Sequence, residues 1–389
     1  MSVAEGDVAK DKLHALCLER IAFFMHKLKG DGYLPYWSAE LEVFFEDKDG
    51  NAVHVDRERM QQYLFDHTRH TLYLGNDIKQ IDEKERHVKS DAGKLYAWGK
   101  EPAKPFSGVT CKLGSYALAK FGIEHYVLPW LARQYEVELL PDPKAKKAVC
   151  DAQLMPGFLQ ELSQMEPLLE RAGSQFGYER VSRYTKSYPH TLGYVATPSL
   201  HLNVSLWQEK DGKLHNCFAG KEEEKPPPLA KRCMRAMVAL QKEGLVLFSE
   251  QDNSNYWLRN DRGYHAPRQI AYDDRKVDYH TVCYRSCKDN PDYAHIENRA
   301  PSARSDPYLA MALTWGALYM AVCRKQFTQW EKQSTSYSDK IIDYEKGRFV
   351  QSTCLREVLG EPLFEAVLQH YHLPSHPSLT RAATTDRGR

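Results

Sequence analysis

The chain has 389 residues, with 53 basic against 52 acidic side chains. This length can bury a sizeable core in one large domain or two modest ones. The balanced charge and the lack of a long basic run exclude an obvious nucleic-acid or anionic-membrane partner. Nine cysteines without a CxxC pair favour a reducing, cytoplasmic compartment over a disulfide-bonded secreted one.

Hydrophobic periodicity predicts several elements along the chain. Helical spacing occurs over residues 9–29, 155–176, 229–243, 306–327 and 353–371. Strand patterns occur over residues 39–46, 52–55, 134–140 and 200–207, the first two as a hairpin. We also expect a charged, proline-rich loop at 220–228. The polar tail at 374–389 is predicted to be disordered. Strands and helices that do not alternate as βαβ units predict an α+β fold.

The run from Tyr308 to Cys323 is uncharged and could be read as a membrane span. Its 16 residues fall short of the roughly 20 that a spanning helix needs. We therefore expect a buried core helix. The polar and charged N-terminus lacks the apolar stretch of a secretory signal.

Four strand-like segments place polar side chains two residues apart, and residues i and i+2 of a strand share a face. They are Glu40 with Glu42, Gln134 with Glu136, His201 with Asn203 and Ser205, and Glu297 with Arg299. Each pattern by itself is typical of a solvated sheet face. Together they bring carboxylates, an imidazole and a guanidinium to one surface, where carboxylates would repel one another unless divalent cations bound there.

Five segments in order resemble the glutamine synthetase catalytic domain, over roughly residues 36–327. They read WSAELEVFFEDKDGN, RQYEVELLPDPKAKKAVCDA, HLNVSLWQEKDGKLHNCFAG, NSNYWLRNDRGYHAPRQIAYDDR and AHIENRAPSARSDPYLAMA. The resemblance implies a curved antiparallel sheet with helices on its convex face, a type shared with guanido kinases. It divides the chain into an N-terminal helical segment (1–35), the catalytic domain (36–373) and the tail (374–389).

The resemblance also implies roles for the matched residues, with ATP and two or more Mg²⁺ or Mn²⁺ ions as cofactors. One metal would be held by Glu42 and Glu136, and a second by Glu40, His201 and Glu297. Arg275 and Arg299 would face the γ-phosphate, and Asn203 and Ser205 would lie near adenine and ribose. Oxygen ligands and arginines suit Mg²⁺-dependent phosphoryl transfer. His201 is a less typical magnesium ligand and could instead be a hydrogen-bonded core histidine.

Several positions depart from the family pattern. His265 replaces the flap glutamate, Trp257 replaces the arginine that clamps the α-carboxylate of glutamate, and His280 replaces a phosphate arginine. Arg259 lies two residues after Trp257. Because the Glu-x-Glu strand begins at residue 40, the small N-terminal β-grasp domain is expected to be missing. We therefore expect a monomer or small homo-oligomer rather than a double ring.

These departures argue against glutamine synthesis itself. The leading hypothesis is a ligase that phosphorylates a small-molecule carboxylate with ATP and couples it to an amine other than ammonia, with His265 assisting deprotonation of the amine. The alternatives are a small-molecule kinase that uses the same site, and a non-catalytic structural or regulatory relative.

Overall fold

The computed structural model describes the chain in thirteen stretches. They are residues 3–46, 73–75, 108–113, 155–176, 180–182, 200–220, 225–248, 269–273, 280–286, 294–301, 305–324, 349 and 352–372. Three of the sequence predictions lie outside these residues: the hairpin return at 52–55, the strand at 134–140 and the tail at 374–389. Of the loop predicted at 220–228, residues 221–224 also lie outside, and residues 225–227 belong to no helix or strand.

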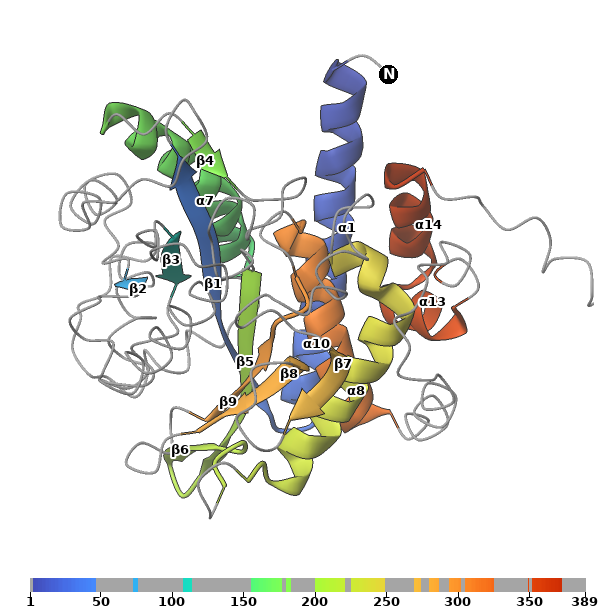
Figure 1. Cartoon of the computed structure of the whole chain (residues 1–389). Helices are drawn as coiled ribbons and strands as arrows, with labels where there is room; N and C mark the ends of the chain where they lie inside the picture. Colours follow the sequence, from blue (N-terminus) through green and yellow to red (C-terminus); the bar gives the residue numbers. More distant parts are fainter. Residues whose placement is uncertain are drawn as a thin grey trace, which may run out of the picture.

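One mixed sheet organises the described part of the chain (Figure 1). Its main path runs in the order β2-β3-β1-β5-β9-β8-β7, while β4 pairs with β1 and β6 pairs with β5. The strands are β1 (Leu34–Glu46), β2 (Tyr73–Gly75), β3 (Gly108–Leu113), β4 (Arg180–Ser182), β5 (Leu200–Lys210), β6 (Lys213–Asn216), β7 (Gln269–Asp273), β8 (His280–Arg285) and β9 (His295–Asn298). Of the described pairings only β7 with β8 is parallel, so the sheet is antiparallel through its centre, in line with the α+β prediction.

The helices lie where periodicity placed them, although α1 begins at Val3 rather than at residue 9. They are α1 (Val3–Gly30), α7 (Met155–Gln175), α8 (Pro228–Gly244), α10 (Pro307–Cys323), α13 (Thr353–Leu359) and α14 (Glu361–His370), with a short 3-10 helix, η3 (Leu245–Phe248). Figure 1 shows α1, α8, α10, α13 and α14 gathered on one side of the β5–β9–β8 part of the sheet. The helix predicted over 353–371 is two helices, because Gly360 has φ 74° and its backbone N–H donates to the carbonyl of Arg356, which ends α13.

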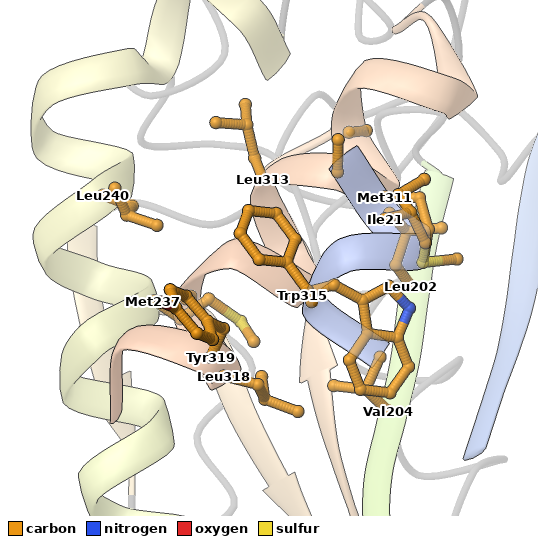
Figure 2. Close-up of a cluster of buried hydrophobic side chains, with 14 of the residues drawn as sticks. Ile21, Leu202, Val204, Met237, Leu240, Met311, Leu313, Trp315, Leu318 and Tyr319 are labelled. Atoms are coloured by element: carbon orange, nitrogen blue, oxygen red, sulfur yellow. The ribbon is translucent and has the colours of Figure 1, made fainter. Parts of the chain in front are cut away.

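Helix α10 is the centre of the core, as its uncharged sequence predicted. Every residue from Tyr308 to Ala321 is buried, and the helix contacts α1, α7, α8 and α13. Figure 2 shows its side chains, Trp315 among them, packed with Ile21 of α1, Val204 of β5 and Met237 of α8. None of the helices in the described ranges is long and apolar enough to cross a membrane.

The apolar side of α1 is buried in the same core. Its members are Leu13, Cys17, Ile21, Phe24, Met25 and Leu28. Where α10 passes α13, the backbone approach is so close that a Cβ added to Gly316 would lie 2.4 Å from a methyl carbon of Val358. A glycine is therefore required at this position of an otherwise bulky helix.

Two polar contacts attach α1 to the rest of the core. The first involves Asp306, the N-cap of α10, whose Oδ1 accepts hydrogen bonds from the backbone N–H groups of Tyr308 and Leu309. Its other oxygen, Oδ2, lies 2.7 Å from Nε2 of His14 in α1. The pKa of Asp306 is lowered: burial raises it, but the hydrogen bond and charge of His14 and the N–H of Leu309 lower it more.

The second contact comes from Arg20 of α1, which binds the C-terminal end of α13. Its Nε donates to the carbonyl of Val358 at 2.5 Å and its terminal nitrogen to that of Glu357 at 2.7 Å. These are carbonyls that the helix itself leaves without partners, at the negative end of its dipole. The guanidinium also lies 4.6 Å from the ring centre of Phe23 and 4.8 Å from that of Phe24.

We predict that Asp306→Ala lowers the free energy of unfolding by about 1–2 kcal/mol at pH 7, because the cap of α10 and the contact with His14 are both lost. Asp306→Asn should cost less, since asparagine is also a good cap. The folded pKa lies below the ordinary value of about 3.9, so the ionised side chain stabilises fully above that value. The contribution is lost as the pH falls through the folded pKa. Urea titrations at several pH values measure both effects, and equal losses for the two variants would contradict the assignment of a cap.

We predict that Arg20→Ala lowers the free energy of unfolding by about 2 kcal/mol, because two carbonyls at the end of α13 lose a charged donor. Arg20→Lys should recover only part of this loss, since an ammonium group lacks the fork that reaches two carbonyls. Urea unfolding followed by circular dichroism measures the change. A lysine variant as stable as the wild type would rule out the forked contact.

Candidate functional site

Strand β5 separates an apolar face from a polar face. Leu200, Leu202, Val204 and Leu206 alternate with His201, Asn203, Ser205 and Trp207, and all eight are buried. Because strand residues alternate between faces, the three leucines and Val204 face the helices, as Figure 2 shows for Leu202 and Val204, while the polar set lies on the opposite face. The polar face is thus the surface on which a site can form.

Strand β9 adds Glu297 to this polar face. Glu297 is paired with Asn203 across the β5–β9 register and with Cys283 across the β8–β9 register. Arg299 follows directly after the strand, and its backbone N–H donates to the carbonyl of Thr281 at 2.8 Å. The described structure therefore brings together four residues that the sequence placed in one site: His201, Asn203, Glu297 and Arg299.

Three basic side chains surround the carboxylate of Glu297. Its Oε1 lies 2.8 Å from Nδ1 of His201 and 3.7 Å from Nε of Arg299. Its Oε2 accepts a hydrogen bond of 2.5 Å from Nε of Arg285 in β8. The side chains of His201, Glu297 and Arg299 are at most 7% exposed, whereas that of Arg285 is 24% exposed. We call these four residues the Glu297 cluster.

The Glu297 carboxylate is ionised despite its burial. Burial raises its pKa, but the charge of Arg285, the charge and hydrogen bond of His201 and the charge of Arg299 hold the pKa well below its usual range. A buried carboxylate is tolerated only with such partners. The cluster thus contains an ionised carboxylate next to two guanidinium groups, which bind phosphate oxygens well.

Ser205 is oriented by an aromatic pair on the same face. Its Oγ accepts a 2.8 Å hydrogen bond from Nε1 of Trp207, and Tyr36 of β1 is opposite Ser205 in the β1–β5 register. The rings of Tyr36 and Trp207 are 5.0 Å apart and buried. Since an oxygen lone pair of Ser205 receives the indole N–H, the hydroxyl proton is directed elsewhere and can serve as a donor.

The backbone register places one further predicted residue, Glu40, beside the Glu297 cluster. In β1, Glu40 is opposite His201 across the β1–β5 register and Glu42 is opposite Thr110 of β3. The register puts position 40 beside the cluster, on the neighbouring strand. Glu136, Arg275, His265, Trp257 and Arg259 lie outside the described residues. His280, at the start of β8, is half-buried.

Arg285 is a functional candidate that the sequence analysis missed. It ends the mostly apolar strand HTVCYR, where one basic residue has no recognisable pattern. In the pairing of β8 with β9, Cys283 is opposite Glu297, and Arg285 lies two residues further along β8. Only this pairing brings the guanidinium of Arg285 to the carboxylate of Glu297. A basic residue at the end of a buried strand was the one available signal.

The described donors can be compared with the needs of a divalent cation. Mg²⁺ takes hard oxygen ligands at about 2.1 Å in octahedral geometry, which puts neighbouring donor atoms about 3 Å apart. Oε1 of Glu297 and Nδ1 of His201 are 2.8 Å apart, the carboxylate is ionised, and position 40 lies opposite His201. This spacing suits two ligands of one ion, provided that Nδ1 of His201 releases the proton that it shares with Glu297, because only a deprotonated ring nitrogen can bind a metal. Within the described residues no group of three metal-binding side chains is found.

Comparisons with known proteins give one match to a family model. Residues 185–335 match the model described as "Glutamine synthetase, catalytic domain". This stretch contains β5, β8, β9 and α10, and with them every member of the Glu297 cluster. A search of curated proteins found no match.

Solved structures were also compared. The GmaS–ADP complex in conformation 1 is 14% identical, with a TM-score of 0.48 over 92% of this chain and 72% of that one. GmaS without ligand is also 14% identical, with a TM-score of 0.47 and the same coverage. Plasmodium falciparum glutamine synthetase is 16% identical, with a TM-score of 0.44 over 79% of this chain and 56% of that one. The family match confirms, over residues 185–335, the resemblance that the sequence motifs indicated: this segment is similar to the glutamine synthetase catalytic domain.

Proposed function

We propose that this protein is an ATP- and Mg²⁺-dependent ligase that activates a small-molecule carboxylate by phosphorylation and couples it to an amine other than ammonia, forming an amide. The observation that carries the proposal is the Glu297 cluster: a buried, ionised carboxylate with two arginines and a histidine, inside the segment of glutamine synthetase type. Buried charge is costly for stability, so a buried group of charged side chains on one sheet face favours a role in catalysis.

The proposed roles follow from the chemistry of each group. The guanidinium groups of Arg285 and Arg299 would bind the transferred phosphate and neutralise the charge that develops on it. Glu297 holds both arginines in place by its contacts with their Nε atoms. His201 and Glu297, with Glu40 on the neighbouring strand, would hold a Mg²⁺ or Mn²⁺ ion, and Glu42 and Glu136 a second. Bound metal would supply further charge neutralisation at the phosphates.

The nucleotide would lie along the polar face of β5. Asn203 and Ser205 follow His201 on this face and would contact ribose and adenine through their amide and hydroxyl groups. The hydrogen bond from Trp207 leaves the hydroxyl of Ser205 free to donate to an acceptor of the nucleotide. Arg275, from the segment that resembles the substrate-arginine loop, is proposed as a further phosphate contact.

The acceptor half of the site motivates the choice of amine. A carboxylate attracts an ammonium cation and takes its proton, whereas His265 stands at the corresponding position here. A neutral imidazole can act as a base near pH 7 but attracts a cation poorly. Trp257 replaces the expected arginine and would offer an apolar wall. Both changes favour an organic amine over ammonia, and His265 as the group that assists its deprotonation.

We predict that the protein binds ATP only in the presence of Mg²⁺ or Mn²⁺, and that Glu297→Gln weakens this binding at least tenfold. Loss of the carboxylate removes a metal ligand and frees both arginines from their anchor. Isothermal calorimetry with and without EDTA measures the affinity. The matched control is Glu357→Gln in α13, which lies outside the Glu297 cluster. This substitution removes an ion pair with Arg324, the residue that follows α10, and should leave the affinity unchanged. Equally tight metal-free binding by the wild type and Glu297→Gln would refute the site.

We predict that ADP release requires an added amine together with a carboxylate, because the acyl phosphate is consumed only when an amine attacks it. A panel of carboxylates crossed with organic amines and ammonium, followed by phosphate release, measures this. Glutamate with ammonium should be among the poor pairs. Carboxylate-dependent ADP release that needs no amine would instead identify a kinase, and the absence of nucleotide binding would identify a non-catalytic relative.

A further inference from the structure

A chain of polar side chains crosses the apolar interface between the sheet and its helices. Thr281 of β8, Gln241 of α8, Asn298 of β9 and Thr314 of α10 are all completely buried. Around them the interface is built from aliphatic and aromatic residues, such as Leu202, which is opposite Asn298 in the register. Asn298 therefore lies at a position where an apolar residue would pack well.

The hydrogen bonds of this chain all run in one direction. The hydroxyl of Thr281 donates to Oε1 of Gln241 (2.5 Å), and Nε2 of Gln241 donates to Oδ1 of Asn298 (2.9 Å). Nδ2 of Asn298 then donates to Oγ1 of Thr314 (2.9 Å), whose hydroxyl donates to the carbonyl of Ala310 (2.7 Å). Reversing the Gln241 amide alone would place its oxygen against Oδ1 of Asn298, so that two acceptors meet. Reversing the Asn298 amide would place its Nδ2 against the backbone N–H of Ala300, so that two donors meet. The network thus permits one arrangement only.

This single arrangement fixes the strand end that carries the site. Asn298 lies between Glu297 and Arg299, and because strand residues alternate, its side chain leaves the sheet on the face opposite Glu297. Its Oδ1 also accepts the backbone N–H of Ala300 at 3.1 Å, which holds the turn that follows the strand. The backbone between Glu297 and Ala300 is therefore fastened from the helix side.

We propose that Asn298, Gln241 and Thr314 are positioning residues for Glu297 and Arg299, which hold the charged cluster in the geometry that binds metal-bound nucleotide. This inference rests on the proposed function. The physical reason is that Glu297 of β9 meets partners from the adjacent strands, Arg285 of β8 and His201 of β5, so that a small rotation of the backbone at residue 298 would separate them. Fully bonded polar groups specify one position more strictly than aliphatic packing, which tolerates sliding.

The test compares two substitutions of Thr314, which lies outside the Glu297 cluster. Thr314→Val keeps the shape of the side chain but leaves Nδ2 of Asn298 without its acceptor, whereas Thr314→Ser keeps the hydroxyl. Calorimetric titration with Mn²⁺ and ATP should show a loss of affinity of about tenfold for the valine variant, the range known for residues that support metal ligands. The serine variant should stay within about twofold of the wild type.

Arg20→Ala is the control for general loss of stability, because Arg20 contacts α13 and not the strands of the site. It should be destabilised yet bind Mn²⁺ and ATP as tightly as the wild type. Should Thr314→Val fail to fold, Thr281→Val at the other end of the chain carries the same expectation.

The outcomes separate the two hypotheses. A wild-type protein that binds no nucleotide with metal overturns the proposed function and, with it, the positioning role. A wild-type protein that binds, with Thr314→Val binding equally well, overturns the positioning role alone. A loss of affinity in Arg20→Ala as large as in Thr314→Val would show that stability rather than position is responsible, and would also overturn it.

Discussion

The rest of the structure depends on helix α10 having no polar face. All residues from Tyr308 to Ala321 are buried, so the helix must be surrounded on every side by apolar partners. The sheet covers one side, and α1, α7, α8 and α13 cover the others. The close approach at Gly316 and the capping of α10 by Asp306 follow from this requirement, since a completely buried helix needs both tight packing and satisfied ends.

The same requirement gives the central strands two unlike faces. On β5, the apolar residues face α10 and its neighbours, so that His201, Asn203 and Ser205 are left on the other face. Glu297 joins them through the register with β9. Burying this carboxylate is unfavourable by itself, and Arg285, Arg299 and His201 offset the cost. The charged cluster is thus positioned by hydrophobic packing and stabilised by its own ion pairs.

Two of the residues that differ from the glutamine synthetase pattern concern the acceptor, whereas a third, His280, replaces an arginine expected at the phosphate. His201, Asn203, Glu297 and Arg299 are present and, in the described structure, lie on or beside the same pair of strands. The replaced positions, His265 and Trp257, belong to the segment expected to bind the carboxylate and the amine. Altered acceptor groups beside these retained residues support the proposed change of amine, because the proposed phosphoryl transfer comes before the attack by the amine.

Much of the fold could be predicted because its signals are local. Helical periodicity located α1, α7, α8 and α10, and strand alternation separated His201, Asn203 and Ser205 from the leucines beside them. The break between α13 and α14 was missed, since a single glycine inside an apolar periodic run reads as a weak helix residue. Its left-handed φ is visible only in the folded backbone.

The sequence by itself determined which side chains carry charge and which face of each strand they share. Only the tertiary structure decided which strands are neighbours, and therefore that Arg285 meets Glu297 and that Asn298 is tied to Gln241 and Thr314. These partners lie 12, 57 and 16 positions apart. The physical reason is that alternation and periodicity are properties of a local chain segment, whereas strand pairing and the partners of a buried polar group depend on how distant segments pack around α10.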